Sequence, residues 1–369
     1  MRIGITGGNG FIGSHLQMYL KTRDDVELVD VATRDTFSST EGLKEFVSDK
    51  ELIVHLAGVN RASDEELVNG NIDPAKQLVE AMKAASITPF VVYSSTTHAE
   101  NTDIPYGKGK SGVSEVFSSW ADENSASFLN LVIPHVFGEF GLPNYNSGTN
   151  TFCHHIANEQ EVEVNGNGQL ELIHVQDLVA LFISLYESKT IGEHRVKGKK
   201  ISVGDVVEKL RLFDEKYKAG IVPDLSDHFD RCLFNTYRSY LPQDARKVIA
   251  TKHTDDRGWL VETVKVGSGG QSFVSTTKPG ITRGNHFHLR KYERFFVLQG
   301  AASIKMRKVN TNEVIEYIIE EGQPALVDIP TLHTHNITNI GDSELITFFW
   351  TDEFFDPENS DTFFELVEA

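Results

Sequence analysis

The sequence predicts two folded parts: an α/β part built on a doubly wound parallel sheet, followed by an all-β barrel. The chain opens with an apolar strand, a glycine-rich turn and an amphipathic helix within residues 2–21. From about Val248 onward, short strands separated by turns replace long helical periodicity. The 369 residues are enough for two domains of ordinary size. We place the boundary just after Pro242, with domains at residues 1–243 and 244–369.

Composition limits the classes of partner. A net charge of −18 argues against nucleic acid or an anionic membrane as a partner. The apolar runs are too short to span a bilayer, and no signal peptide fits before a strand that starts at Arg2, so we expect a cytoplasmic protein. The two cysteines, Cys153 and Cys232, lie far apart in the sequence and are expected to be reduced thiols.

The glycine-rich turn indicates a dinucleotide site. Its glycines are spaced G-x-x-G-x-x-G, directly after the first strand and directly before the first helix. The N-terminus of a helix offers backbone N–H groups to a diphosphate, and glycine permits the close approach. The predicted cofactor contacts in this turn are Gly7, Asn9, Gly10, Phe11, Ile12 and Gly13.

The end of the second strand predicts which dinucleotide binds. The strand runs from Val26 to Val31 and is followed by Arg34, at the point where a dinucleotide fold meets the adenosine ribose. An acidic residue there binds a ribose 2′-hydroxyl, whereas an arginine suits a 2′-phosphate. Arg34 therefore favours NADPH, while Asp30 and Asp35 leave NADH open. A solvated surface residue is the alternative interpretation of Arg34.

A tyrosine and a lysine four residues apart indicate reductase chemistry. Tyr106 and Lys110 share one face if they lie on a helix. Hydride transfer to a ketone leaves an alkoxide that needs a proton, and a tyrosine supplies it when a neighbouring ammonium lowers the tyrosine pKa. A hydroxyl at the end of the strand that precedes them can orient the carbonyl.

In this order, the motifs resemble the extended short-chain dehydrogenase/reductase family over about residues 1–200. The resemblance implies a Rossmann fold in which Leu52 to Gly58, similar to the family's fourth-strand motif, lies against the cofactor. Similar members that modify sugar nucleotides carry a segment like His135 to Gly138. For the hydroxyl, Ser94 and Ser95 are alternatives to Thr96. The implied residues are Leu56, Ala57 and Gly58 at the cofactor, and Thr96, Tyr106 and Lys110 as the catalytic set.

The stretch from Gly280 to Gly300 indicates a metal site. His286 and His288 are two residues apart, so on a strand both imidazoles point to one face. Glu293 starts the next apolar run, which could place its carboxylate beside them. Two histidines and a glutamate are good ligands for a divalent metal.

The pattern G-x5-H-x-H-x4-E-x6-G resembles the first motif of the cupin superfamily, and Pro330, His335 and Asn339 resemble the second, with Leu332 where glycine is usual. The resemblance implies an all-β cupin barrel that holds a divalent metal, with zinc expected. The implied ligands are His286, His288, Glu293 and His335.

Two flanking stretches, Asp256 to Glu262 and Arg283 to His286, resemble deoxysugar 3,5-epimerases, which are also cupins. In those epimerases the histidine matched by His286 is a base and no metal is used. A ligated imidazole has no free lone pair for proton transfer. We favour metal ligation and leave the base open, with Tyr292, Lys278 and Asp328 as candidates.

The whole chain resembles bifunctional capsular-polysaccharide enzymes that join the two folds. This resemblance implies a UDP-linked 4-keto-6-deoxy amino sugar as substrate, epimerised at C3 by the cupin and then reduced at C4 with NADPH, giving UDP-N-acetyl-6-deoxy-L-talosamine. A homodimer is expected. One alternative is a 4-ketosugar reductase whose cupin only dimerises it. Another is a non-catalytic NADPH or nucleotide-sugar sensor, against which the intact Thr96, Tyr106 and Lys110 argue.

Overall fold

The computed structural model describes residues 1–164, 168–249, 253–255, 258–260, 265–266, 270–353 and 358–368. The chain divides into two compact units. The first comprises Met1–Phe137, Asn144–Ser147 and Gln169–Ser202, and the second comprises Gly138–Pro143, Gly148–Gly168 and Val203–Ala369. Residues 203–243 therefore cluster with the barrel, and the domain boundary after residue 243 stays a prediction.

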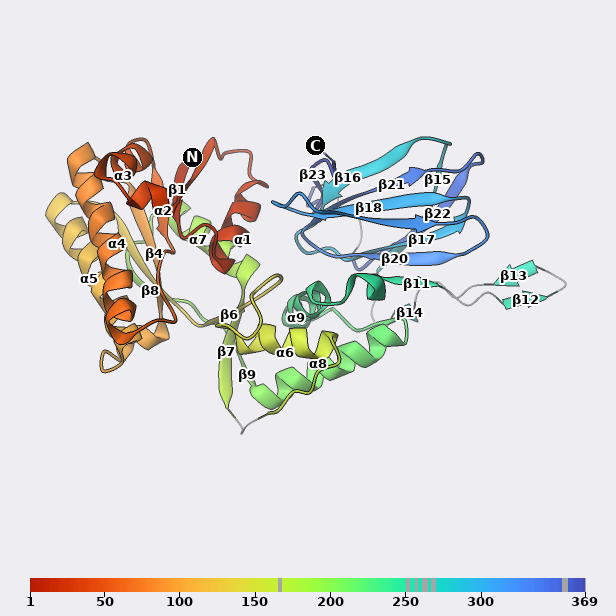
Figure 1. Ribbon diagram of the computed structural model, residues 1–369, viewed down its shortest axis with the longest axis horizontal. Helices are drawn as coiled ribbons and strands as arrows, with labels where there is room; N and C mark the ends of the chain where they lie inside the picture. Colours follow the sequence, from red (N-terminus) through yellow and green to blue (C-terminus); the bar gives the residue numbers. More distant parts are fainter. Residues whose placement is uncertain are drawn as a thin grey trace. The chain divides into compact units, whose positions relative to one another are not determined.

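The first unit is built on a six-stranded parallel sheet with the order β2-β1-β3-β4-β5-β8 (Figure 1). Its strands are β1 (Arg2–Thr6), β2 (Leu28–Ala32), β3 (Leu52–His55), β4 (Phe90–Thr96), β5 (Phe128–Ile133) and β8 (Gly192–Arg195). Its helices are α1 (Phe11–Leu20), α2 (Arg34–Phe37), α3 (Thr40–Val47), α4 (Asp64–Ala85), η1 (Thr97–Glu100), α5 (Pro105–Asn124) and α7 (Val175–Glu187).

Helices cover both faces of this sheet. Side chains of α3, α4 and α5 share one apolar core with the sheet, and side chains of α1 and α7 share another. The central strands are buried throughout, which explains their continuous apolar runs. A smaller sheet contains β6 (His135–Phe137), β7 (Gln169–His174) and β9 (Lys199–Ser202). The predicted doubly wound Rossmann fold is confirmed.

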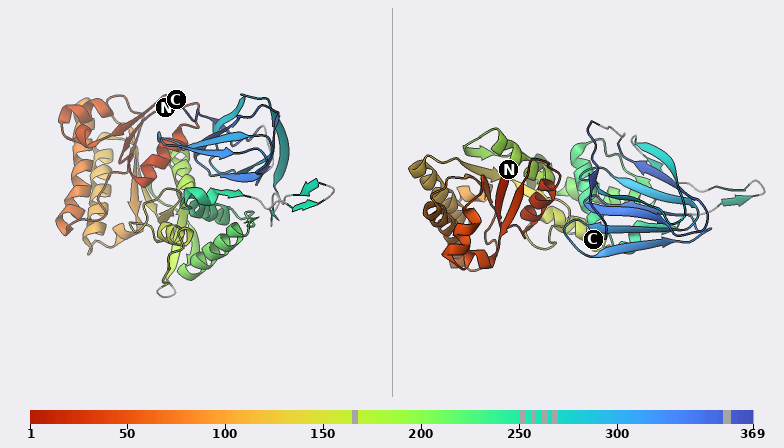
Figure 2. Two further views of the ribbon diagram at one scale, coloured as in Figure 1. Left: turned by 45° about the vertical axis from the view of Figure 1, so that its right-hand side comes forward. Right: turned by 90° about the horizontal axis from the view of Figure 1, so that it is seen from above.

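The second unit contains two five-stranded antiparallel sheets that curve around one apolar core (Figures 1 and 2). One sheet has the order β11-β20-β17-β22-β15, with bounds β11 (Lys247–Ile249), β20 (Ala325–Ile329), β17 (Glu293–Gln299), β22 (Leu345–Thr351) and β15 (Gln271–Thr277). The other has the order β19-β18-β21-β16-β23, with bounds β19 (Val314–Ile319), β18 (Ala302–Lys308), β21 (His333–Asn339), β16 (Thr282–Phe287) and β23 (Phe363–Phe364). The predicted cupin barrel is confirmed.

Helices also belong to the second unit, and two of them pack on the outside of the barrel. The unit contains α6 (Gly148–Ala157), α8 (Val203–Lys218), α9 (His228–Ser239) and η2 (Gln243–Arg246). Tyr217 of α8 and Arg238 of α9 both reach barrel residues. Short strands complete the unit: β10 (Ile221–Val222), β12 (His253–Asp255), β13 (Gly258–Leu260) and β14 (Lys265–Val266). Among the helices of the described residues, none is both long and apolar enough to cross a bilayer.

Two candidate functional sites

The glycine-rich turn brings backbone close to backbone at the end of β1. Gly7 has φ +69°, and a Cβ there would lie 2.6 Å from the backbone nitrogen of Ala57. Helix α1 begins at Phe11, and its N-cap Gly10 contributes no side-chain cap. The first-turn N–H groups of a helix have no partner within the helix, so Phe11 and Ile12 can present theirs to a phosphate. Asn9 and Gly10 are exposed beside them.

The turn after β3 is fixed against the glycine turn. The Leu56 backbone N–H donates to the Thr6 carbonyl at 3.1 Å, and the Ala57 N–H donates to the Thr6 hydroxyl at 3.2 Å. Asn71, buried in α4, holds the far side of the turn through the backbone N–H and carbonyl of Val59. Leu56, Ala57 and Gly58 therefore form a rigid surface next to the predicted cofactor turn.

Arg34 is the first residue of α2 and is exposed. The acidic alternative on β2 is already engaged, since the Asp30 carboxylate pairs with Lys50 Nζ at 2.6 Å, and the Lys50 side chain is 2% exposed. Asp30 is therefore poorly placed to compete for a ribose hydroxyl. Arg34 and its exposed neighbour Asp35 follow directly after the strand, so Asp35 is the acidic residue that remains as an alternative.

The proposed catalytic lysine is buried behind the tyrosine. Lys110 Nζ lies 3.5 Å from the Ser94 carbonyl oxygen and 5.9 Å from the centroid of the Tyr106 ring. Burial lowers the pKa of Lys110 to about 8. Burial also raises the pKa of Tyr106, so the expected lowering by a nearby ammonium is not what the structure shows. A neutral phenol is nevertheless the form that donates a proton during reduction.

Of the three candidate hydroxyls, Thr96 is the one that reaches the end of β4. Ser94 and Ser95 are 6% and 2% exposed, whereas Thr96 is only half-buried. The Thr96 hydroxyl accepts a hydrogen bond from the His98 backbone N–H at 3.3 Å, and so caps η1. Its own proton stays available to a substrate oxygen.

Two histidines that sequence analysis did not single out lie beside the tyrosine. The His98 ring centroid is 6.2 Å from that of Tyr106 and 6.3 Å from that of His135. Both histidines are exposed. His135 begins the segment His135 to Gly138, which resembles a segment of sugar-nucleotide enzymes. That resemblance was the sequence signal that could have pointed to this histidine. His98 carried none.

Gly109 explains how a helix with poor helix formers stays packed. A Cβ on Gly109 would lie 2.4 Å from the Leu67 carbonyl oxygen of α4. The glycine lets α5 approach α4 closely, which compensates for its low helix propensity. This contact fixes the first turns of α5, which carry Tyr106 and Lys110.

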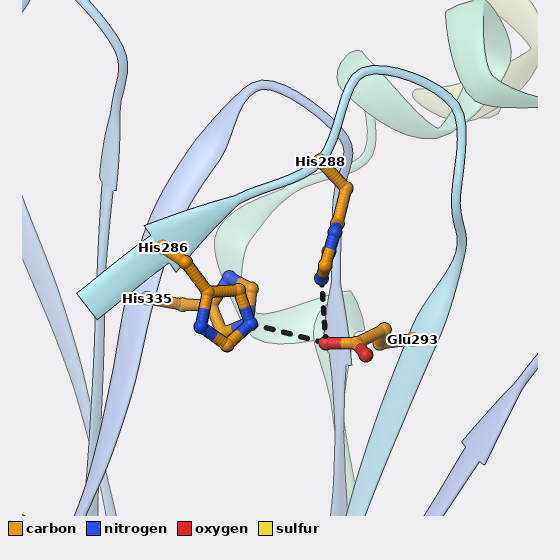
Figure 3. A group of neighbouring side chains, drawn as sticks. All are labelled: His286, His288, Glu293 and His335. Atoms are coloured by element: carbon orange, nitrogen blue, oxygen red, sulfur yellow. Dashed lines mark ion pairs between the residues drawn. The ribbon is translucent and has the colours of Figure 1, made fainter. Parts of the chain in front are cut away.

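In the barrel, the four predicted metal ligands meet. His286 lies on β16, His288 directly follows that strand, Glu293 begins β17, and His335 lies on β21. Their ligand atoms all lie within 4.8 Å of one another. Glu293 Oε2 lies 3.0 Å from His288 Nε2 and 3.2 Å from His335 Nε2 (Figure 3). The irregular register between Gly284 and His286 aims the strand end at the cluster.

The tautomers of two of these histidines suit a metal. Nδ1 of His288 donates to the Asp361 carbonyl, and Nδ1 of His335 donates to the His333 carbonyl at 3.1 Å. Each Nε2 is then left with a lone pair, and both Nε2 atoms are buried without a hydrogen-bond partner among the residues that the structure describes. They face a carboxylate, which also only accepts. A cation among these acceptors would satisfy all three, so the residues fit a divalent metal.

The charges agree with that fit. Burial opposes ionisation of Glu293, but His288 and His335 outweigh it and hold the pKa of the carboxyl well below its usual range. Burial, and then the neighbouring His335 and His288, lowers the pKa of His286 to about 3. Burial opposes protonation of His288, but Glu293 in turn outweighs burial and raises the pKa of His288, so a metal, which binds neutral imidazole and ionised carboxylate, would have to displace a proton there.

The second cupin-like motif keeps its shape despite its departure from the pattern. Leu332, where glycine is usual, has φ +59°, the left-handed conformation that glycine favours. Asn339 is structural, since its amide donates to the carbonyls of Thr277 and Ser343 at 2.8 and 2.9 Å. Pro330 precedes the turn that leads into β21.

Asp361 supports the cluster and was not predicted. Its carboxylate accepts from the backbone N–H groups of Leu289, Arg290 and Lys291 at 3.2, 2.9 and 2.8 Å. Its own carbonyl orients His288. The loop from β16 to β17 is therefore held by one aspartate about seventy residues on, a contact that no local pattern reveals.

The candidate epimerase bases do not face the cluster. Arg294 pairs with Asp328 across the strands, while its neighbour Glu293 points to the cluster, so Arg294 and Asp328 lie on the opposite face of the sheet. The Tyr292 hydroxyl donates to Asp328 at 2.7 Å and is fully buried. Lys278 is exposed on a loop. The epimerase-like stretch Asp256 to Glu262 lies partly outside the described residues.

Comparison with known proteins agrees with both folds. The NAD dependent epimerase/dehydratase family matches residues 3–204, and the polysaccharide biosynthesis C-terminal domain matches residues 253–363. The fold and the first site define a nicotinamide-dependent enzyme class. Because the first match covers more than half of the chain, the chain belongs to the NAD-dependent epimerase/dehydratase family.

Two known proteins are similar to this chain over nearly its whole length. UDP-2-acetamido-2,6-beta-L-arabino-hexul-4-ose reductase of Pseudomonas aeruginosa PA103 is 33% identical over 368 residues, 98% of each chain. Among solved structures, the capsular polysaccharide assembling protein CapF of Staphylococcus aureus matches with a TM-score of 0.64 and 35% identity over 100% of both chains. UDP-N-acetylglucosamine 4-epimerase of Methanobrevibacter ruminantium M1 shares the fold alone, with a TM-score of 0.55 and 21% identity over 65% of this chain and 97% of its own.

Proposed function

We propose that the protein is a bifunctional sugar-nucleotide enzyme of capsule biosynthesis. Its barrel epimerises C3 of a UDP-4-keto-6-deoxy-N-acetylhexosamine, and its Rossmann unit then reduces C4 with NADPH to give UDP-N-acetyl-6-deoxy-L-talosamine. One observation carries the proposal: a single chain holds both the Tyr106–Lys110 pair and the four-residue barrel cluster. The full-length similarity to CapF and to the Pseudomonas reductase supports it.

In the reduction step, a nicotinamide cofactor, when bound, would supply the hydride for C4. Tyr106 donates its phenolic proton to the C4 oxygen, so that the ketone becomes a secondary alcohol. Thr96 orients that oxygen through its hydroxyl. Lys110, buried behind the ring, stabilises the negative charge left on Tyr106.

NADPH is the proposed form of the cofactor. The glycine turn and the start of α1 receive the diphosphate, through Gly7, Asn9, Gly10, Phe11, Ile12 and Gly13. Arg34 would pair with the 2′-phosphate. The engagement of Asp30 by Lys50 supports this choice over NADH.

Epimerisation must precede reduction. The C3 proton is acidic only while C4 is a ketone, because the enolate spreads its charge onto the C4 oxygen. His286, His288, Glu293 and His335 would hold a divalent metal, for which we propose zinc. Such an ion would act as a Lewis acid toward that oxygen. If the cluster bound no metal, His286 would be the candidate base, since its pKa of about 3 leaves it neutral.

Product analysis tests the proposal and separates it from its alternatives. Full-length protein would be incubated with a UDP-4-keto-6-deoxy-N-acetylhexosamine, with and without NADPH, and the products identified by NMR. We expect a C3 epimer without NADPH and a C4 alcohol with it. Reduction without any change at C3 would favour a plain reductase whose barrel serves as the contact of a homodimer. Binding of NADPH with no turnover would favour a sensor.

A further inference from the structure

Residues 138–143 directly follow β6 in the sequence, yet they belong to the same compact unit as the barrel. Glu139 in this segment is 1% exposed. Its carboxylate accepts a hydrogen bond from the Thr331 hydroxyl at 3.0 Å, and Thr331 is itself buried. A carboxylate is costly to bury without partners, and the Thr331 hydroxyl is one partner of Glu139.

Thr331 begins a chain of contacts that ends at the metal cluster. Its carbonyl accepts from His333 Nδ1 at 3.0 Å, and the His333 carbonyl accepts from His335 Nδ1 at 3.1 Å. The backbone N–H of Leu332 donates to the His288 carbonyl at 2.8 Å. The turn at residues 331–333 thus supports both ligand histidines whose Nε2 atoms face Glu293.

The segment that carries Glu139 is itself held in place. The Asn150 side chain donates to the Gly138 carbonyl at 2.8 Å, and the Tyr240 hydroxyl donates to the Gly141 carbonyl at 2.5 Å. The Phe140 ring packs 5.6 Å from the His333 ring and lies under Lys308 Nζ at 3.7 Å. Glu139 is therefore held in place as an acceptor. Its hydrogen bond with Thr331 then helps to hold the next residue, Leu332, in the left-handed conformation.

We propose that Glu139 and Thr331 are positioning residues for the barrel metal centre. They hold the 331–333 turn so that His335 and His288 direct their Nε2 atoms at the ion. The inference rests on the proposed metal site. It means that the centre needs a segment encoded between β6 and α6, more than one hundred residues before the first ligand.

The test compares three full-length variants with the wild type. Thr331→Val keeps the side-chain shape but removes the donor, and Thr331→Ser restores it. Thr347→Val is the matched control, because Thr347 is a buried barrel threonine whose hydroxyl has no hydrogen-bond partner in the described part of the chain. The measurements are the Co²⁺ dissociation constant by chelator competition and the ligand-field absorption of bound Co²⁺.

We expect Thr331→Val to weaken Co²⁺ binding by about 10-fold and to shift the absorption bands. This is the lower end of the effect of losing a hydrogen bond to a metal ligand, because the Thr331 hydroxyl bonds Glu139 and supports the ligands only through the 331–333 turn. Thr331→Ser and Thr347→Val should match the wild type. Should Thr331→Val fail to fold, Glu139→Gln replaces it; it keeps the accepting oxygen without the charge, so a loss of about threefold to tenfold is expected.

Two negative results have different meanings. A wild-type protein that binds no Co²⁺ would refute the metal site and the metal-assisted mechanism with it, while the product analysis at C3 tests epimerisation itself. Stoichiometric wild-type binding, with unchanged affinity and spectrum in folded Thr331→Val or Glu139→Gln, would refute only the positioning role.

Discussion

Tyr106 has the environment of a proton donor rather than of a surface phenol. Burial raises its pKa, so it stays protonated at neutral pH. Tyr106→Phe keeps the ring and removes the proton, and NADPH oxidation with a ketosugar should fall about 100-fold or more. Tyr186→Phe in α7 is the control and should leave the rate unchanged. Near-normal oxidation by Tyr106→Phe would remove this residue from the mechanism.

The buried Lys110 should destabilise the folded protein, because its ammonium group makes one weak hydrogen bond among the described residues. Burial lowers its pKa from 10.5 to about 8. Between these two pKa values the unfolded chain binds more protons than the folded chain, so the free energy of unfolding rises with pH across that window. Below about pH 8 the full cost of burying the charged lysine applies. Lys110→Met should raise the unfolding free energy by about 1–3 kcal/mol at pH 7, less at pH 10, while abolishing reduction. Denaturant unfolding at both pH values would show this; a destabilised variant at pH 7 contradicts it.

Arg34 is predicted to select the cofactor by its charge. Arg34→Ala should raise the KM for NADPH by about 10-fold or more, the effect of losing a charge-assisted contact to phosphate, and leave the KM for NADH almost unchanged. Arg34→Lys keeps the charge and should lose less. Steady-state kinetics with both cofactors decide the matter, and equal losses with both would indicate a folding defect instead.

At the residue scale, sequence analysis found groups that recur in patterns and missed groups that act from a distance. The H-x-H spacing located His286 and His288, and the structure brings both to Glu293 and His335. Asp361 and Glu139 could not be found, since Asp361 holds His288 across 73 residues and Glu139 reaches Thr331 across 192. Thr331 lies close to His335 in the sequence but belongs to no recurring pattern. The metal and catalytic roles themselves stay predictions.

At the scale of elements, a buried charge network attaches helices to the barrel. Arg294 Nε donates to Asp328 Oδ1 at 2.7 Å, and the hydroxyls of Tyr292 and of Tyr217, from α8, bond the same carboxylate. Arg238 of α9 stacks 3.9 Å above the Tyr292 ring. The network lies on the sheet face opposite the metal cluster, so its role is to hold α8 and α9 against the barrel.

Removing one member of this network should be costly. Asp328→Asn leaves the buried Arg294 without its counter-charge and should destabilise the second unit by about 3–5 kcal/mol. Asp342→Asn, an exposed aspartate of the same barrel, should change stability by less than about 0.5 kcal/mol. Thermal or denaturant unfolding measures both. Equal stability of the two variants would show that the network is dispensable.

Elements with strong periodicity could be predicted, and their assignment to units could not. The start of helix α4 (Asp64–Ala85) is marked in the sequence by a capping box of Ser63 and Glu66. Residues 203–243 were assigned to the reductase half, but the structure groups them with the barrel. Contacts such as that of Tyr217 with Asp328 decide this grouping, and local sequence does not encode them.

At the scale of the whole molecule, the two proposed sites divide one reaction sequence. Proton exchange at C3 needs the ketone and the barrel cluster, whereas reduction needs Thr96, Tyr106, Lys110 and the cofactor. Lesions in one site should therefore spare the chemistry of the other. The barrel is contacted by helices and by the Glu139 segment, which lie before residue 244. The full chain, and not residues 244–369 alone, is therefore the suitable protein for this test.

The most direct measurement of this division is deuterium incorporation at C3, followed by NMR in heavy water without NADPH. The full-length Tyr106→Phe protein would be incubated with the 4-ketosugar nucleotide in three states: loaded with metal, stripped of metal, and reloaded with metal. The double variant with Tyr106→Phe and His288→Ala would be measured in parallel. We predict exchange in the loaded and reloaded samples, and its loss in the stripped sample and the double variant. Undiminished exchange after complete metal removal would contradict the metal-assisted epimerisation and return His286 to the role of a metal-free base.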